Sequence, residues 1–469
     1  MDTKFNFFDK KFNYIQFHNR QLAKKSPGMV NSKVVSWSVT VALGGFLFGF
    51  DTAVISGAEK SIQALWTLNV FEHGLTISIA LIGTVFGSLF GGIPAERYGR
   101  RKTLLGVAVL YLVSALGSAL APDWYSFLLF RFLGGLGVGA SSVAAPLYIA
   151  EIAPAQARGR MVALFQCNIV FGILIAYLSN YGLASLGEFS WRWMLGVQAL
   201  PSAIFFGLLL NVPESPRWLI RRRGQIAEAR AILLVIEPTT AEESILAIQR
   251  GNTNTNAPDE SLWSGQYRTP ILLAVVFAVF NQVSGINAII YYAPRIFEMT
   301  GLGASSSLLS TAGLGIVNFA FTLLAINFID RFGRRRLMLI GSVGLIVTLM
   351  LVARAFFQQD FGGLTVPILL FIYIAFFAFS QGAVIWVFIS EIFPNAVRAQ
   401  GQALGSFTHW IMAALIAFTF PYFADQLGGG LTFGFFALMM VCQLVFVWRW
   451  MPETKGTRLE QPEQTIVLH

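Results

Sequence analysis

Two charged residues lie inside long apolar stretches of the sequence. Asp51 belongs to the apolar run 34–57, and Arg131 interrupts another such run. A charge at the centre of a bilayer costs at least ~2.5 kcal/mol on insertion scales, so both side chains are expected to face a cavity and to pair. A carboxylate beside an arginine is ionised while paired and protonates when the pair separates. The chemistry is therefore that of a proton carrier or, alternatively, of a static ion pair between two helices.

A second group of polar side chains has the chemistry of hydroxyl recognition. Four of them share the apolar run 271–292: Asn281, Gln282, Asn287 and Tyr291. Amides and hydroxyls can bond the hydroxyls of a small solute, and aromatic faces cover its apolar surface. Gly285 permits local unwinding here, and Pro294 is expected to end the helix nearby. The alternative is hydrogen bonding between helices, for which membrane proteins also use amides.

The elements that carry these residues are predicted to be membrane helices. The chain has 469 residues, of which 55% are hydrophobic and 12% charged, with a mean hydropathy of +0.63; soluble domains average roughly 25% charged residues. About twelve apolar runs reach the ~20 residues needed to cross a bilayer. They lack the period-2 alternation of barrel strands, so the prediction is an all-α membrane protein with twelve transmembrane helices.

The distribution of basic residues predicts the orientation. The net charge is +9, and most of the 33 Lys and Arg residues lie in the N-terminal segment, the loops after even-numbered spans and the C-terminal tail. This asymmetry is the positive-inside rule with both termini cytoplasmic, and it leaves no charge to be explained by a nucleic-acid partner. The basic residues expected on the opposite side are Lys60, Arg192, Arg295 and Arg354.

The cysteines and the N-terminus give no sign of a cofactor or a cleaved leader. Cys167 and Cys442 both lie in apolar runs, so neither a disulfide framework nor a cysteine metal site is expected, and no cofactor is predicted. Residues 1–33 are basic and contain no apolar h-region, which argues against an ordinary signal peptide. Met29, just before the first span, is an alternative start to Met1.

Internal repetition predicts two halves. Three motifs recur in the same order at a spacing of about 240 residues, beginning at Glu96 and Asp330, at Glu151 and Glu391, and at Pro213 and Pro452. Two six-helix halves in parallel orientation follow, with a solute site between them near the membrane midplane. The predicted domains are a cytoplasmic segment 1–33, a half 34–212, a helical linker 213–267, a half 268–452 and a cytoplasmic tail 453–469.

These motifs, together with 48–57, 131–135, 213–218 and 452–456, resemble the sugar porter family of the major facilitator superfamily over roughly residues 34–458. The resemblance implies a monomer in a bacterial inner membrane that moves a small polyhydroxylated solute by alternating access. It also implies that five further residues face the solute: Phe48, Gln166, Asn318, Trp386 and Trp410. For the three aromatic residues among them, packing is the competing explanation.

The sequence departs from the family pattern at three places. Asn281 stands where the family usually has the first of two glutamines, His409 stands where an amide is common, and Gly382-Ala383 replaces the usual Gly-Pro. His409 is expected to line the site as a neutral hydrogen-bonding residue, with proton relay as the alternative.

The resemblance also implies a cytoplasmic gate of opposite charges, which could pair when that side is closed and separate when it opens. The alternative is that these charges only anchor the helix ends. The residues are Glu96, Arg97, Arg100, Glu151, Arg158, Glu214, Arg217, Arg331, Arg334, Glu391 and Arg398.

Energy coupling is predicted from Asp51. Sugar porters that only facilitate diffusion commonly carry Asn at this position, and resembling proton symporters carry Asp. Gln198 is a partly contrary sign, because one proton-coupled relative has an acid there, and it leaves Asp51 as the only buried carboxylate expected in the first half. The predicted function is import of a neutral monosaccharide, hexose or pentose, together with a proton.

Four rival functions compete with this one. A facilitative uniporter for a sugar, polyol or cyclitol would have the same fold, and so would a non-transporting sugar sensor, although the tail after Pro452 is short for one. An organic acid would call for an unpaired cation, whereas Arg131 has a partner in Asp51. An enzyme would need convergent catalytic groups, but the histidines are scattered: His18, His73, His409 and His469.

Overall fold

The computed structural model describes residues 31–154, 157–253, 261–394 and 397–455. Twelve segments in this part of the chain are helical, long and apolar enough to cross a membrane, as the sequence predicted. Most of the predicted N-terminal segment, including Met29, and most of the predicted tail lie outside the described residues.

The N-terminal half contains six spans, several of which begin at a side-chain cap. Asn31 caps the first helix, Asn69 and Glu72 form a capping box on the second, and Asp123 caps the fourth. The helices are α2 (Ser32–Leu65), α3 (Val70–Phe90), α4 (Gly92–Tyr98), α5 (Arg100–Leu120), α6 (Trp124–Ile152), α7 (Arg158–Leu183), η1 (Ala184–Leu186), α8 (Ser190–Gly196) and α9 (Ala199–Leu209).

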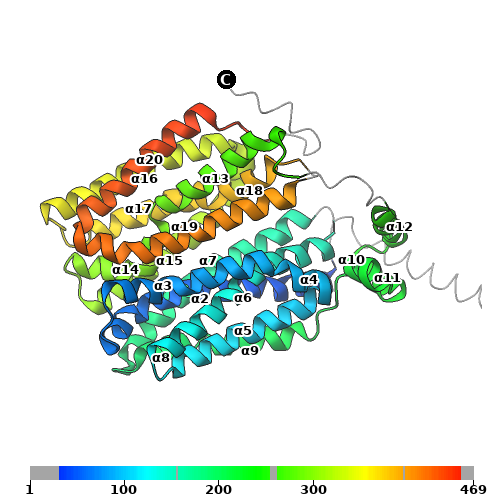
Figure 1. The fold of residues 1–469 in the computed structure, drawn as a ribbon, viewed down its shortest axis with the longest axis horizontal. Coiled ribbons are helices and arrows are strands. Elements are labelled where there is room, and N and C mark those ends of the chain that lie inside the picture. The colour runs from blue at the N-terminus through cyan, green and yellow to red at the C-terminus, as the bar shows by residue number, and fades with distance from the viewer. Residues whose placement is uncertain (1–30, 155–156, 254–260, 395–396, 456–469) are drawn as a thin grey trace, which may run out of the picture.

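The predicted linker folds into short helices. These are α10 (Pro216–Trp218), η2 (Leu219–Arg223), α11 (Ile226–Ile236), α12 (Ala241–Thr253) and η3 (Gly265–Tyr267). One face of α11 is apolar and buried, with Ala229, Ile232 and Leu233 at helical spacing. Figure 1 shows α10, α11 and α12 together at one end of the molecule, which we call the linker end. The opposite end is called the far end.

The C-terminal half repeats the six-span pattern. Its helices are α13 (Arg268–Val283), α14 (Ile286–Met299), α15 (Ala304–Phe332), α16 (Arg334–Gln358), α17 (Thr365–Phe379), α18 (Gln381–Glu391), α19 (Arg398–Gln426) and α20 (Gly428–Trp450). Figure 1 shows this half above the N-terminal half, and α2, α3 and α7 pack against α14, α19 and α15, respectively.

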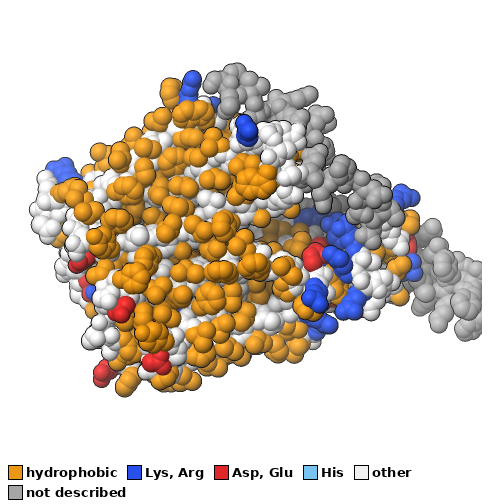
Figure 2. Space-filling view, in the orientation of Figure 1, with side chains coloured by type: hydrophobic (Ala, Val, Ile, Leu, Met, Phe, Trp, Pro, Cys, Tyr) orange, Lys and Arg blue, Asp and Glu red, His pale blue; other side chains and the backbone are white. Residues whose placement is uncertain are grey.

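The outside of the bundle has the character of a membrane protein. Figure 2 shows hydrophobic side chains over most of the visible face, while Lys and Arg side chains gather at the linker end. The first span also begins at this end, since the Asn31 side chain donates a hydrogen bond to the Val235 carbonyl of α11. The 34 residues of α2 reach from there toward the far end, about 51 Å away.

The seventh span is broken at Gly285, as predicted, but the expectation that Pro294 ends the helix is wrong. Gly285 has a φ of 88°, and α14 continues past Pro294 with a kink at Tyr292. A proline cannot bond the carbonyl four residues earlier, which here belongs to Ile290. The Tyr177 hydroxyl donates to that carbonyl at 2.8 Å, so the backbone group stays satisfied and the helix persists.

The tenth span is also broken, although Gly382-Ala383 replaces the family's Gly-Pro. Ser380 has φ −115° and ψ −90°, and it separates α17 from α18. The break lies against α16, where any Cβ on Gly341 would overlap the Ser380 side chain. The tenth span is therefore broken without a proline, at a point where it packs closely against α16.

Candidate functional site

The predicted ion pair between the first and fourth spans is present. Arg131 Nη1 lies 2.8 Å from Asp51 Oδ1, and Nη2 donates to the Asp51 carbonyl at 3.2 Å. Both residues are only 1% exposed, so the charges compensate each other inside protein. Gly134, one turn after Arg131, keeps α5 close, because a Cβ there would overlap the Ser114 hydroxyl.

The C-terminal half reaches this pair through Tyr291. This side chain of α14 is 1% exposed, and it lies close to Asp51, to the next residue Thr52 and to Arg131. Thr52 in turn donates to the Phe48 carbonyl at 2.9 Å. A predicted solute-binding residue thus lies beside the helix turn that carries the predicted proton-binding residue.

The predicted amides converge across the break in the seventh span. Gln282 Nε2 donates to Asn281 Oδ1 at 2.7 Å, and Asn287 Nδ2 donates to Gln282 Oε1 at 2.5 Å. Gln282 Nε2 also lies 3.1 Å from His409 Nδ1 on α19, so a neutral ring nitrogen can accept there. Because Gly285 interrupts the helix, side chains before and after it meet at one place.

Aromatic rings extend the amide cluster toward the N-terminal half. The ring centroids of Trp386 and His409 are 4.7 Å apart, and those of His409 and Trp410 are 4.8 Å apart. Phe48 of α2 lies 5.5 Å from Trp410. These four residues and the amides form what we call the central cluster, which contains no carboxylate or ammonium group. It is suited to a neutral solute.

Two of the predicted solute-facing residues are not joined to the central cluster by a hydrogen bond. Gln166 lies on α7 and Asn318 on α15, both partly exposed, and neither side chain has a hydrogen bond to another described residue. Their helices pack against each other across the two halves. Both amides are therefore available to a ligand.

At the linker end of the N-terminal half, the predicted gate residues form a network around Arg100. The guanidinium binds Glu151 through two contacts of 3.0 Å and Glu96 at 2.7 Å. Glu214 accepts from the backbone N–H groups of Arg100 and Arg101 at 2.9 and 3.1 Å. The network joins the start of α5 to the end of α6 and to the first turn of the linker.

The C-terminal half repeats this network with its own residues. Arg334 binds Glu391 at 2.7 and 3.0 Å, and Glu453 accepts from the backbone N–H groups of Arg334 and Arg335 at 2.8 and 3.1 Å. Among the described residues, neither network joins one half to the other. The sequence repeat alone does not distinguish this arrangement from pairing between the halves.

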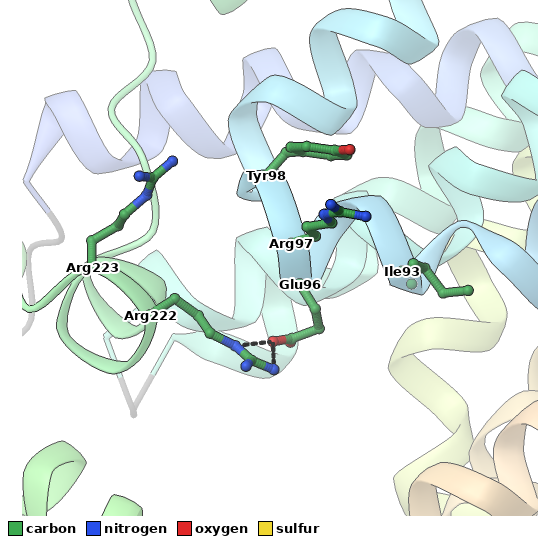
Figure 3. A pocket seen from close by; sticks show the side chains of 7 residues that line it. Ile93, Glu96, Arg97, Tyr98, Arg222 and Arg223 are labelled. Carbon is green, nitrogen blue, oxygen red and sulfur yellow. Dashed lines mark hydrogen bonds and ion pairs between the residues drawn. The ribbon is translucent and has the colours of Figure 1, made fainter.

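The other predicted gate residues take smaller parts. Arg158 donates to the Ala150 carbonyl of α6, and Arg398 donates to the Phe393 carbonyl just after α18. The Arg97 guanidinium lies over the Tyr98 ring, the Arg331 carbonyl accepts a bond from Lys455, and Arg217 is exposed. Figure 3 shows a pocket at this end, in which Arg222 of η2 points toward Glu96 at 3.4 Å. The linker is thereby tied to the N-terminal half.

Comparison with known proteins decides the family. A family model described as "Sugar (and other) transporter" matches residues 37–465. The chain belongs to this sugar transporter family. It is 35% identical to a D-xylose-proton symporter of Escherichia coli (strain K12) over 92% of this chain and 96% of that one, and 37% identical to an arabinose-proton symporter of Bacillus subtilis (strain 168) over 92% and 94%.

Solved structures show that this sugar transporter has the major facilitator fold. An inward-open structure of the xylose transporter XylE from E. coli superposes with a TM-score of 0.82, at 34% identity, over 92% of this chain and all of that one. The proton:xylose symporter XylE bound to 6-bromo-6-deoxy-D-glucose gives 0.76, at 34% identity, over 93% and 100%. The predicted fold class is confirmed.

Sequence reasoning missed one buried charged cluster in this sugar transporter, and one of its expectations is wrong. Asp51 is not the only buried carboxylate of the first half, because Glu59, near the end of α2, is 0% exposed. The far end of this long helix is covered by α3 and α14 rather than by lipid, so a carboxylate can be buried there. Glu59 contacts His73 and Arg295, and the spacing of these residues in the sequence did not predict either contact.

The ion pairs that join the halves lie at the far end. Arg295 pairs with Glu59, and Lys60 pairs with Glu298, in both cases between α2 and α14. Among the described residues, the ion pairs at the linker end lie inside one half, inside the linker, or between the linker and the N-terminal half. Ion pairs between the two halves thus hold the far end of this sugar transporter closed.

Proposed function

We propose that this sugar transporter imports a neutral monosaccharide, hexose or pentose, in symport with a proton by alternating access. The observation that carries the proposal is the position of the Asp51–Arg131 pair. It is fully buried, and beside it lies Tyr291 of α14, the helix that also supplies Asn287 of the central cluster. Sugar bound by those amides and a proton bound by Asp51 can therefore influence the same helix contacts.

The central cluster supports a sugar as the solute. Its amides offer donors and acceptors to hydroxyl groups, and Trp386, Trp410 and Phe48 offer apolar faces to a sugar ring. Gln166, Asn318 and Tyr291 complete the proposed binding residues. The names of relatives agree in class, because they include D-xylose, arabinose and glucose transport.

We further propose that the linker end is cytoplasmic. Lys and Arg gather there, and the positive-inside rule places such an end on the cytoplasmic side. The distribution of basic residues along the sequence assigns both termini to that same side. The far end is then extracellular, and the protein works as a monomer in the inner membrane of a bacterium, with two halves at 34–212 and 268–452 as its moving domains.

Reconstitution tests the proposed substrate and coupling. In proteoliposomes, unlabelled pentoses and hexoses should compete with one transported labelled sugar, and adding that sugar should drive proton influx. Competition by an organic anion but by no sugar or polyol would contradict the substrate. Sugar exchange with no proton influx would identify the protein as a uniporter.

The cytoplasmic networks give a further prediction. We propose that they shape the surface on which the halves close, so that Glu391→Gln favours the inward-open state. The readout is a single cysteine at Leu147, which lines a pocket in the other half, away from the substitution. Its labelling should accelerate about 5-fold, the effect of ~1 kcal/mol.

The matched control for this prediction is Glu242→Gln. It breaks an exposed pair with Arg230 inside the linker and should leave the labelling rate unchanged. Unchanged labelling in Glu391→Gln as well, or equal acceleration in both variants, would show that the network only anchors the helix ends.

A further inference from the structure

A buried carboxylate and a buried histidine lie together near the extracellular end of the N-terminal half. Glu59 of α2 and His73 of α3 are both 0% exposed, and Nε2 of His73 lies 2.8 Å from Oε2 of Glu59. The two helices are joined by a short connection, so these residues belong to one rigid half. Neither residue takes part in the proposed sugar site or the Asp51–Arg131 pair.

The positive partner of Glu59 comes from the other half. Arg295 of α14 donates from Nε to Oε1 and from Nη2 to Oε2, both at 2.9 Å, and also bonds Gln63. This bidentate pair compensates the buried carboxylate while the extracellular end is closed. Alternating access must separate α2 from α14 here, which removes Arg295 and leaves His73 in place.

The charge balance of the cluster then changes. With the end closed, Glu59 and Arg295 cancel and His73 can remain neutral. With the end open, Glu59 loses its guanidinium, and a buried carboxylate without a partner is costly. A proton taken up by the Glu59–His73 pair restores neutrality, because it removes the charge of the carboxylate or gives it an imidazolium partner in place of the guanidinium.

We propose that Glu59 and His73 form a second proton-binding site, open to the outside, and that Arg295 competes with the proton for it. Proton binding then favours the outward-open state, and closure returns the proton to the exterior. The site differs in role from Asp51, whose partner Arg131 lies in the same half. An acidic exterior would thereby increase the population ready to accept sugar.

The other groups around the cluster do not supply the same compensation. On α14, Tyr292 presents its ring to His73, and Glu298 pairs with Lys60 of α2. Lys60 stays with the N-terminal half on opening, but its side chain is 41% exposed and turned toward Glu298. On α3 itself, Glu72 is occupied in capping, and α19 contributes the Phe418 backbone beside Gly74. His73 is therefore the group in direct contact with Glu59.

The test measures opening of the extracellular end directly. Spin labels are placed at Tyr125 and Leu364, which are exposed near that end of different halves, after replacement of Cys167 and Cys442 by Ser. The inference rests on alternating access in the proposed function, but the distance between the labels requires neither sugar nor a proton gradient. A failure of symport would therefore not imitate a failure of this proposal.

The expected result is a pH-dependent population. Since the proton is proposed to bind the open state better than the closed state, lowering the pH from 8 to 5.5 should raise the open-to-closed ratio by about 3-fold or more. The response should persist in Asp51→Asn and disappear in His73→Gln, which keeps a polar side chain beside Glu59 but cannot take up a proton. Arg295→Gln should favour the open state already at pH 8.

Three outcomes would overturn the proposal. One is a population that does not depend on pH. A second is a response that survives in His73→Gln but is lost in Asp51→Asn, which would assign it to the deeper pair. The third is loss of the response in Lys60→Gln but not in His73→Gln, which would make Lys60 the group that replaces Arg295. If His73→Gln does not fold, Glu59→Gln serves in its place and should also abolish the response.

Discussion

Asp51→Asn should abolish uphill accumulation of sugar and preserve sugar counterflow. An amide neither takes up nor releases a proton at physiological pH, so the variant can cycle with sugar but cannot draw on the proton gradient. In the wild type, one proton moving down ~100 mV supplies ~2.3 kcal/mol, enough for about fifty-fold accumulation if coupling is tight. The variant should fall to about one-fold, as measured by uptake into vesicles with an imposed gradient.

The structure shows which side effect must be controlled. Arg131 loses its carboxylate and keeps only amide and carbonyl acceptors, so the variant is expected to be less stable. Counterflow reports that the folded, sugar-binding protein survives. Asp123→Asn is the matched control, because it makes the same chemical change at the exposed cap of α6, where Asn also caps.

The outcome distinguishes a proton carrier from a static ion pair. If Asp51→Asn still accumulates sugar against its gradient, the pair only joins α2 to α6 and coupling resides elsewhere. If both accumulation and counterflow vanish while the protein stays folded, the carboxylate is required for the conformational cycle itself rather than for coupling alone.

Gln282→Ala should weaken sugar binding by about 5- to 150-fold, which corresponds to roughly 1–3 kcal/mol. Gln282 is the centre of the amide cluster, since it contacts Asn281, Asn287 and His409. Its removal takes away bonds to the solute and leaves neighbouring amides without a partner. Isothermal titration with a transported sugar measures the change, and Asn287→Ala should behave similarly.

Gln443→Ala is the matched control for this prediction. Gln443 is a buried glutamine on α20 that donates to Ser342 of α16, away from the central cluster. Its replacement should lower the thermal stability and leave the sugar affinity unchanged. Equal losses of stability and affinity in Gln282→Ala would instead mean that its amide holds helices together and contributes no solute contact.

Local and compositional features determined most of the architecture. Span length follows from how many apolar residues cross a bilayer, and breaks follow from residues such as Gly285, so both could be predicted one segment at a time. The repeat predicted two halves. The cost of isolated charge predicted the pairing of Asp51 with Arg131, because few partners were available inside apolar spans.

Features that depend on contacts between helices needed the tertiary structure. Pro294 is tolerated because Tyr177, far away in the chain, bonds the carbonyl that the proline leaves free. The two arginine networks repeat in sequence, but only their positions show that each closes within its own half.

The buried charged cluster at the far end shows most clearly what sequence spacing does not predict. Glu59, His73 and Arg295 stand on three helices, and each taken singly is consistent with a residue near a membrane surface. The sequence by itself determined that the chain crosses the membrane about twelve times as two related halves and carries a charged pair inside the first half. Which side is closed, and which buried groups meet there, was decided only by packing, because the free energy of a buried charge depends on neighbours that sequence spacing does not specify.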